Sequence, residues 1–447
     1  MAFACLLVIS PFYLLGLGLL GITPLGNRLW LVTSDSSETF RGLALLLSWG
    51  VIFNFGIFMF SPAITHSVLT GTVLSIAGYI LNYRFAIELL KKSFTLSPPP
   101  IVFALMIIAL GVQILLHPLQ EWDARSIWFF HAKFFYFNGS AFSLVGWTNP
   151  NYGFSHPDYP VLVPALASQV ATVVGNWNEY LPKASILLML IPALLLLSSY
   201  FRKRWSFVFL ILMQLFVTLK FIDNGLMDGL IALYASLALL ELAIAPLSKF
   251  KSLLVVSFFA LAVGLKNEGQ LLVLSIGLAF LISSLRFQKF TLRMPRISIR
   301  ELRIGLLTIL LFVPQVLWML HVKELGLKND MNLGMSSVSI ILNRLTDVHS
   351  WILIGSSMFV KSHLIFWLPI FWLITKAEQH FGRVLGSSRI FHLFFAIYSV
   401  GLIAVYLSTP YDLKWHLSTS TTRTTLPLLL AMSGAAYVRL RNIDQNL

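Results

Sequence analysis

The chain places an acidic side chain that could do acid–base chemistry directly after an apolar run. Asp123 lies in the stretch 121–125, a few residues beyond His117, where the apolar run ends. A carboxylate beside Trp122 and Trp128 at such a boundary is partly desolvated, which makes it a stronger base. The alternative is that Asp123 caps the helix that follows it. Glu121 is either its partner or a solvated neighbour.

Two basic side chains at the ends of other apolar runs could bind a phosphate group. Arg423 carries a planar guanidinium that matches two phosphate oxygens, whereas Lys266 supplies a movable point charge. The alternative for both is that a long basic side chain reaches from the end of a membrane helix towards water.

A further set of acidic and histidine side chains lies at the same kind of boundary and could line a pocket or hold a divalent ion: His156, Asp158, Asp228, Glu268 and His416. None of them shows the ligand spacing of a dedicated metal site, and a single histidine at the end of a helix is more often only hydrogen-bonded. The sequence therefore leaves a metal ion open.

The composition indicates that the candidate site residues are positioned by membrane helices. Of the 447 residues, 57% are hydrophobic and 11% are charged, against roughly 25% charged residues in soluble domains. The same values exclude a disordered chain, and the single cysteine, Cys5, excludes a disulfide framework. The sequence predicts an all-α polytopic membrane protein.

Apolar runs long enough to cross a bilayer recur along the whole chain. About thirteen are expected, at 3–22, 41–60, 63–82, 101–117, 184–201, 205–221, 227–245, 253–266, 271–285, 304–321, 352–374, 390–408 and 424–440.

The basic residues predict the orientation of these runs. The chain has 32 Lys and Arg against 18 Asp and Glu, an excess of 14, and on the alternating topology this excess falls on one side, which is expected to be cytoplasmic. The acidic residues collect on the other, outer side. Because orientation accounts for the basic residues, no nucleic-acid partner is expected, and the chain is expected in a plasma membrane, in bacteria the inner membrane.

Two outer segments are too long to be simple connections. Residues 118–182 are expected to hold an aromatic interfacial helix at 126–137, stopped by Gly139, and a short apolar helix at 161–174 that does not cross the membrane. Residues 321–351 are expected to form a flexible lid, because they contain four small residues: Gly326, Gly334, Ser336 and Ser337.

The order of these stretches resembles the membrane glycosyltransferases of the GT-C fold, above all the branch of protein O-mannosyltransferases and lipid A aminoarabinose transferases. The resemblance covers about residues 99–447, and residues 1–98 are expected to be additional N-terminal helices. It rests on six stretches of the sequence: 121–125, 156–160, 179–183, 223–229, 266–269 and 409–423.

The resemblance implies a GT-C-like catalytic bundle that transfers a sugar from a polyprenyl-phosphate donor to a lipid, glycan or protein acceptor at the outer face, with inversion at the anomeric carbon. It also implies that Asp123 is the base and that Arg423 and Lys266 bind the donor phosphate. The alternative is a secondary transporter or lipid flippase, but no internal repeat is evident and the ionisable residues gather at one side.

Overall fold

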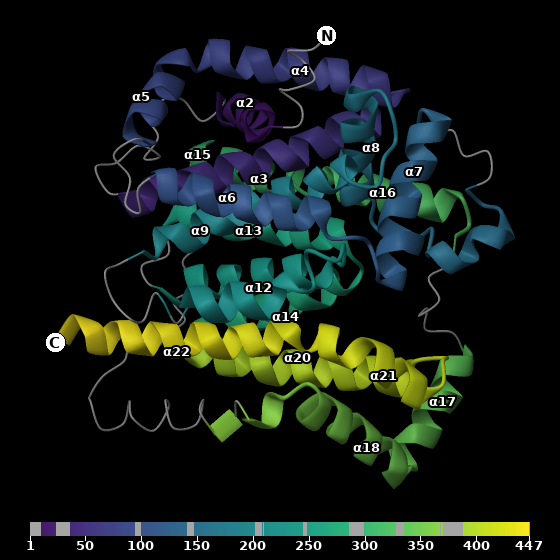
Figure 1. Ribbon diagram of the computed structural model, residues 1–447. Helices are drawn as coiled ribbons and strands as arrows, with labels where there is room; N and C mark the ends of the chain where they lie inside the picture. Colours follow the sequence, from purple (N-terminus) through teal and green to yellow (C-terminus); the bar gives the residue numbers. More distant parts are fainter. Residues whose placement is uncertain are drawn as a thin grey trace.

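The computed structural model describes most of the chain, and within the described ranges it is built of helices without a strand. These ranges are 10–23, 36–93, 100–140, 147–201, 208, 210–244, 248–285, 299–327, 335–366, 368–369 and 388–446. The long helices lie side by side in layers, and α7, α8 and α16 gather at one end of the bundle (Figure 1).

The helices of the first half are α2 (Pro11–Ile22), α3 (Ser36–Phe60), α4 (Ile64–Leu81), α5 (Tyr83–Ser93), α6 (Pro100–Leu116), α7 (Phe129–Asn138), α8 (Leu162–Val174), α9 (Ala184–Ser199), α11 (Val217–Leu219) and α12 (Asp228–Ala243). Those of the second half are α13 (Lys249–Leu265), α14 (Glu268–Leu285), α15 (Ile299–Leu310), α16 (Val313–Glu324), α17 (Met335–Thr346), α18 (Val348–Gly355), α20 (Ser388–Ser408), α21 (Leu413–Thr424) and α22 (Leu426–Asn446).

Four of the described helices are long and apolar enough to cross a membrane, judged by length and composition: Ser37–Phe60, Ile64–Leu81, Leu181–Ser199 and Arg389–Ser408. Other apolar helices, among them α2, α8 and α14, are shorter. The structure thus confirms an all-helical chain with apolar helices of membrane-spanning length, but not the expected count of thirteen.

Three of the expected runs differ from a single straight helix. The run 304–321 is divided into α15 and α16, because Pro314 lacks the N–H that would continue the helix and stands in its first turn. In the run 205–221, residues 205–207 and 209 lie outside the described residues, and the rest contains the π-helical turn η5 (Leu212–Phe216) and ends at Leu219.

The run 352–374 begins in α18, which passes into the π-helical segment η6 (Ser356–Lys361). The backbone then turns at His363, whose φ of +63° is uncommon for a residue with a side chain. Residues 370–387 lie outside the described residues.

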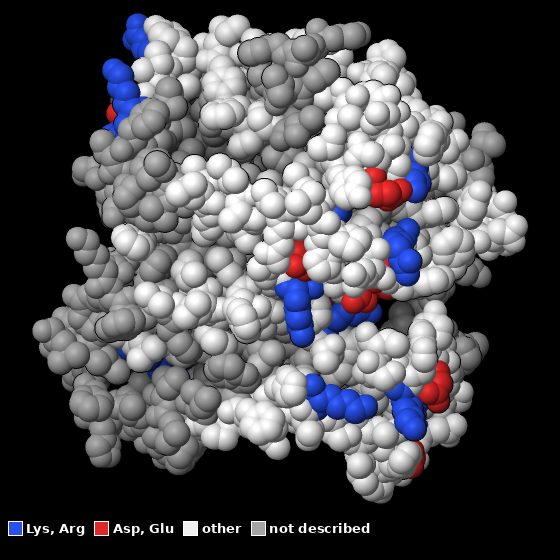
Figure 2. Space-filling view, viewed as in Figure 1, with Lys and Arg blue, Asp and Glu red and all other residues white. Residues whose placement is uncertain are grey.

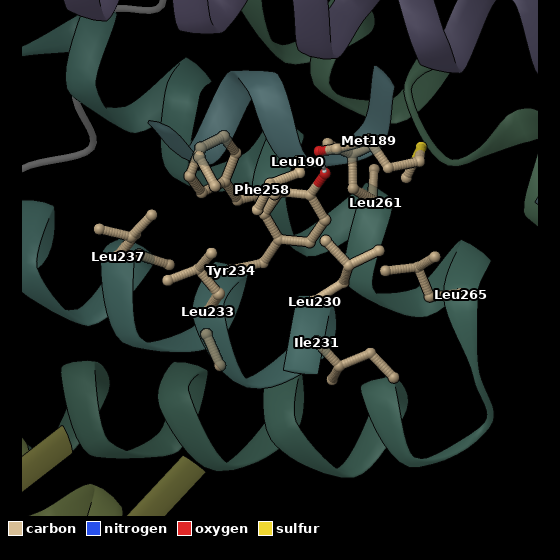
Figure 3. Close-up of a cluster of buried hydrophobic side chains, with 14 of the residues drawn as sticks. Met189, Leu190, Leu230, Ile231, Leu233, Tyr234, Leu237, Phe258, Leu261 and Leu265 are labelled. Atoms are coloured by element: carbon tan, nitrogen blue, oxygen red, sulfur yellow. Dashed lines mark hydrogen bonds between the residues drawn. The ribbon is translucent and has the colours of Figure 1, made fainter. Parts of the chain in front are cut away.

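The centre of the bundle is formed by α9, α12 and α13, whose side chains are buried almost throughout. Tyr234 of α12 packs against Phe258 of α13, with ring centroids 5.0 Å apart, and its hydroxyl donates to the carbonyl oxygen of Met189 in α9 (Figure 3). Because a buried hydroxyl without a partner is costly, this bond fixes α12 against α9 in one register.

The N-terminal helix α3 is joined to this centre by buried polar contacts. Arg41 Nε donates to Glu241 Oε1 over 2.9 Å, and Tyr200 Oη donates to the same oxygen over 2.6 Å. Near the other end of the helix, Asn54 Nδ2 donates to Gln169 Oε1 of α8 over 2.7 Å. Residues 36–60, expected as part of an additional N-terminal segment, therefore pack directly against α8, α9 and α12.

The segment 118–182 contains the two helices expected from its sequence. The aromatic helix is formed by the π-helical turn η2 (Ala124–Trp128) and α7, which ends at Gly139 with φ +72°. Glycine adopts this left-handed conformation without steric cost. The short apolar helix is α8, which ends at Gly175 in the same conformation.

The expected lid segment 321–351 is more ordered than a flexible loop. Helix α16 continues to Glu324, α17 covers Met335–Thr346, and α18 follows at once. Arg344 of α17 donates to the carbonyl oxygens of Thr409, at 2.6 Å, and Tyr411, at 3.0 Å. The expectation of a loop is therefore wrong for 335–346, because these contacts hold α17 on the end of α20. Residues 328–334, which include Gly334, lie outside the described residues. That the segment 321–351 moves over a ligand stays a prediction.

The contact between α2 and α3 depends on glycine. A Cβ added to Gly50 would lie 1.9 Å from the carbonyl oxygen of Leu14, whereas one added to Gly277 of α14 would meet nothing within 4 Å. We expect Gly50→Ala to destabilise the protein by about 1–3 kcal/mol, because the two backbones must separate. Gly277→Ala should be neutral or stabilising by up to ~1 kcal/mol.

Thermal unfolding of the two variants in the same detergent measures this difference. Equal unfolding temperatures for Gly50→Ala and the wild type would show that the two helices do not approach each other this closely.

Candidate functional site

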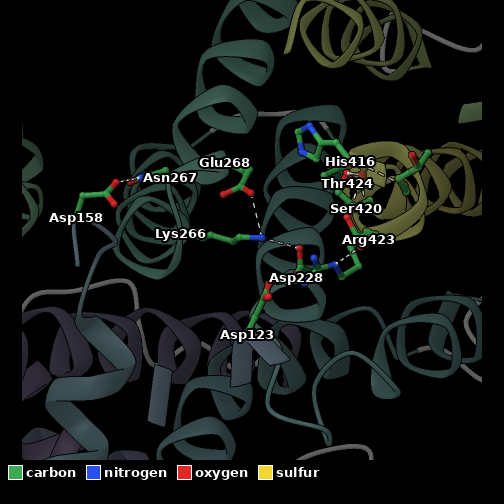
Figure 4. Close-up of polar contacts among 12 residues, drawn as sticks. Asp123, Asp158, Asp228, Lys266, Asn267, Glu268, His416, Ser420, Arg423 and Thr424 are labelled. Carbon is green, nitrogen blue, oxygen red and sulfur yellow. Dashed lines mark hydrogen bonds and ion pairs between the residues drawn. The ribbon is translucent and has the colours of Figure 1, made fainter. Parts of the chain in front are cut away.

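Five charged side chains from four segments of the chain lie close together (Figure 4). Asp123 precedes η2, Asp228 begins α12, Lys266 follows α13, Glu268 begins α14, and Arg423 lies in the last turn of α21. We call these five residues the ion-pair cluster. The sequence had marked every one of them as a candidate.

The distances show a connected network. Arg423 Nη1 lies 2.5 Å from Asp123 Oδ2 and 3.8 Å from Asp228 Oδ2. Lys266 Nζ lies 3.1 Å from Asp228 Oδ1 and 3.0 Å from Glu268 Oε1. Asp228 is thus the carboxylate shared by both cations.

Glycine residues allow the backbone to bring these side chains together. A Cβ on Gly269 would lie 2.1 Å from the carbonyl oxygen of Ala262, so only glycine permits the tight turn that carries Lys266 and Glu268. Gly225, with φ +88°, lies where a Cβ would meet Leu119 at 2.5 Å. These contacts give a structural reason for the glycines in the stretches 223–229 and 266–269.

The cluster has a buried half and a more accessible half. The side chains of Lys266 and Asp228 are 5% and 7% exposed, whereas those of Arg423 and Asp123 are 17% and 21% exposed. Burial disfavours the charged form of Arg423, but Asp228 and Asp123 more than offset it, so that the pKa of the guanidinium is raised above its ordinary value. Arg423 stays charged at any physiological pH.

Asp123 does not cap the helix that it precedes. Its backbone is helical and its side chain accepts no bond from the first turn of η2. The carboxylate is instead directed to Arg423, 300 positions away in the sequence. The structure thus excludes the helix cap that the sequence had left open for Asp123.

A polar wall from α20 and α21 adjoins the ion-pair cluster. Tyr406 Oη lies 2.8 Å from Thr424 Oγ1 and 3.1 Å from Ser420 Oγ, and its ring lies 5.3 Å from that of His416. Burial, together with the cations Arg344, Arg423 and Lys266, lowers the pKa of His416 to about 4. The imidazole is therefore neutral at pH 7.

Two buried polar atoms around the cluster have no partner among the described residues: Glu268 Oε2 and His416 Nδ1. Buried polar groups are nearly always hydrogen-bonded in native proteins. Such unsatisfied atoms beside the ion-pair cluster are expected where a polar ligand supplies the missing hydrogen bonds.

The remaining candidates lie beside the cluster and are not part of it. Asp158 is buried and its Oδ2 accepts a bond of 3.1 Å from Asn267, the neighbour of Lys266. His156 stacks on Tyr159, with ring centroids 5.0 Å apart. Glu121 is exposed and lies 3.5 Å from Asn224, as expected of a solvated neighbour.

The structure also brings to the site two residues that the sequence did not mark. Tyr159 is close enough to the acidic side chains that burial and the nearby Glu268 and Asp158 raise its pKa well above its ordinary value. Tyr406 contributes a hydroxyl from within an apolar run. Tyr406 lies in an apolar run, where a tyrosine is usually a core residue, so the sequence carried no signal for it. Tyr159 lies in the stretch 156–160, of which only His156 and Asp158 were candidates.

On the face shown in Figure 2, acidic and basic side chains lie together at the end of the bundle where α7 and α21 lie. Within the described ranges, no group of three or more His, Cys, Asp or Glu side chains is arranged to hold a metal ion. Three carboxylates stand against two cations in the ion-pair cluster, so the site carries one excess negative charge.

Comparison with known proteins adds no assignment. No family model matches the chain, and neither the curated proteins nor the solved structures contain a significant match to it.

The shared position of Asp228 predicts that it contributes most to stability among the acidic residues of the cluster. Asp228→Asn leaves the buried Lys266 and the partly buried Arg423 without their common carboxylate, and we expect a loss of about 3 kcal/mol. Asp123→Asn should cost less, because its side chain is more exposed. Unfolding temperatures in detergent measure the order, with Glu179→Gln on the surface as the control. A larger loss for Asp123→Asn would contradict the arrangement.

Proposed function

We propose that the protein is an inverting glycosyltransferase that moves a sugar from a polyprenyl-phosphate donor to a lipid, glycan or protein acceptor. In this proposal the apolar runs form a GT-C-like bundle of about thirteen membrane helices, and the ion-pair cluster faces the outer side of the plasma membrane, in bacteria the inner membrane. The observation that carries the proposal is the ion pair of Arg423 with Asp123, because a guanidinium suits a phosphate and a carboxylate can act as a general base.

The first role belongs to Arg423 and Lys266, which bind the donor phosphate. An anion gains little from a cluster with an excess negative charge, so a phosphate has to replace one of the carboxylates. Asp123 is the one that can leave, because it is the most exposed partner of Arg423, whereas Asp228 is buried and held by Lys266 as well. The guanidinium then turns from Asp123 to the phosphate.

The second role belongs to Asp123, which this exchange releases to act as the base. The acceptor hydroxyl gives its proton to Asp123, and its oxygen attacks the anomeric carbon from the face opposite the phosphate. The bond from the anomeric carbon to the phosphate oxygen breaks, and its electron pair stays on the phosphate. Lys266 and Arg423 stabilise the second negative charge that the departing polyprenyl phosphate acquires.

Because the two roles are coupled, the donor has to bind before Asp123 can accept a proton. While the donor is absent, Arg423 occupies Asp123 and the base is blocked. Donor binding both supplies the electrophilic carbon and frees the carboxylate, so the base becomes active only when there is a sugar to transfer. The neutral His416 and the hydroxyl of Ser420 border the same space and can hold sugar or acceptor hydroxyls.

A direct test compares the wild type with Asp123→Asn. The purified protein is incubated with a panel of polyprenyl-phosphate sugars, and sugar transfer or donor hydrolysis is measured. We expect Asp123→Asn to lower turnover by about 10²- to 10⁴-fold, as loss of a general base does.

Glu179→Gln serves as the matched control, because Glu179 is an exposed carboxylate that pairs with Lys133 on the surface. It should turn over like the wild type. Wild-type turnover in a folded Asp123→Asn protein would remove Asp123 as the base.

A further inference from the structure

A small cavity lies next to the ion-pair cluster and has a different chemical character. It is lined by polar side chains from three segments, Asp158, Asn267, Gln270 and Gln315, and by the aromatic side chains of Phe55 and Trp318. Its volume is about 20 Å³, room for about two water-sized groups. No lysine or arginine is among the residues that line it, all of which lie in the described ranges.

Gln315, which lines this cavity, has a buried polar atom without a partner among the described residues. The residue is 4% exposed, and its Nε2 donates to the carbonyl oxygen of Ala260 over 2.9 Å. Its Oε1 is buried and accepts no hydrogen bond from the described residues. Such an acceptor costs about 1–3 kcal/mol when it stays unsatisfied, so a donor from a ligand or a water belongs there.

The polar groups of the cavity suit a neutral hydroxyl. Asp158 supplies a carboxylate and Gln315 an amide oxygen, both of which accept from an O–H group. The absence of a lining cation disfavours an anion, and the aromatic walls suit a CH₂ group beside the hydroxyl. A CH₂–OH group has two heavy atoms, which matches the volume of the cavity.

One turn of the backbone joins the cavity to the ion-pair cluster. Lys266 and Glu268 belong to the cluster, and Asn267 between them lines the cavity and donates to Asp158 (Figure 4). A ligand that places its phosphate on Lys266 therefore lies next to the turn whose other side chain, Asn267, lines the cavity.

We propose that this cavity receives the hydroxymethyl arm of the donor sugar and so selects hexoses over 6-deoxyhexoses. The inference rests on the proposed function and adds to it the class of sugar. Gln315 accepts the hydrogen bond of the arm and acts as a specificity residue, outside the bond-making step.

The test measures binding, so that it does not depend on turnover. Binding of decaprenyl phosphate, of decaprenyl-phosphate hexoses (glucose, mannose and galactose) and of their 6-deoxy counterparts is measured on the full chain in detergent. For at least one hexose, the wild type should bind the hexose donor at least about tenfold more tightly than the corresponding 6-deoxy donor. The reason is that the 6-deoxy sugar leaves the buried amide oxygen of Gln315 without a hydrogen bond. Gln315→Leu should reduce this ratio to less than about twofold and leave the affinity for decaprenyl phosphate unchanged.

Gln120→Leu is the matched control, because Gln120 is an exposed glutamine away from the cavity, and it should keep the wild-type ratio. Equal affinity of the wild type for every hexose and its 6-deoxy form would overturn the inference while the proposed function stands. An unchanged ratio in a folded Gln315→Leu protein would also overturn it. If decaprenyl phosphate itself does not bind, the proposed function fails, and the inference fails with it.

Discussion

Two cations, the buried Lys266 and the partly buried Arg423, share one carboxylate, that of Asp228, and the candidate site depends on these two contacts. Charges removed from water are tolerated only when they are paired and hydrogen-bonded. Asp228 meets this need for both cations from the first turn of α12, where the positive end of the helix dipole also favours an anion. Asp123 and Glu268 can then change their contacts while Lys266 and Arg423 each keep a carboxylate partner.

The apolar bundle gives this pairing its geometry. Five helix ends meet at the cluster, and tight approaches at Gly225 and Gly269 fix the turns that carry the charged side chains. Farther along the same helices, the contact between Tyr234 and Met189 holds α12 on α9. A site built at helix ends in this way has one rigid half, Asp228 with Lys266, and one half, Asp123 with Arg423, that is open to exchange. In the proposed reaction Lys266 and Arg423 together bind the phosphate, and the exchange at Arg423 releases Asp123 as the base.

Much of the site could be predicted from the sequence, because ionisable residues are costly at the edge of a membrane and those found there usually orient a helix or take part in chemistry. Asp123, Asp228, Lys266, Glu268 and Arg423 all stood out in this way, and the structure brings them together. The individual partners could not be predicted, because the contact between Asp123 and Arg423 joins segments 300 positions apart.

Other features followed from tertiary contacts that hydropathy does not describe. Pro314 divides an apolar run that looks continuous, and Arg344 binds carbonyl oxygens and so turns an expected loop into a packed helix. Gln315 is a polar residue in an apolar run, which is a signal that could have been recognised. The cavity that it lines, however, is formed by four separate segments and could not be predicted. Tyr406 carried no signal, because a tyrosine in an apolar run is usually a core residue, and Tyr159 was not recognised beside His156 and Asp158.

The central claim is that donor phosphate replaces Asp123 on Arg423. The most direct measurement is an electron cryomicroscopy structure of the wild-type protein in lipid nanodiscs with decaprenyl phosphate bound. The account predicts phosphate density between Arg423 and Lys266, with Asp228 still bound to Lys266 and the carboxylate of Asp123 beyond hydrogen-bond distance of the guanidinium. Phosphate density elsewhere, with the contact between Asp123 and Arg423 intact, would contradict it.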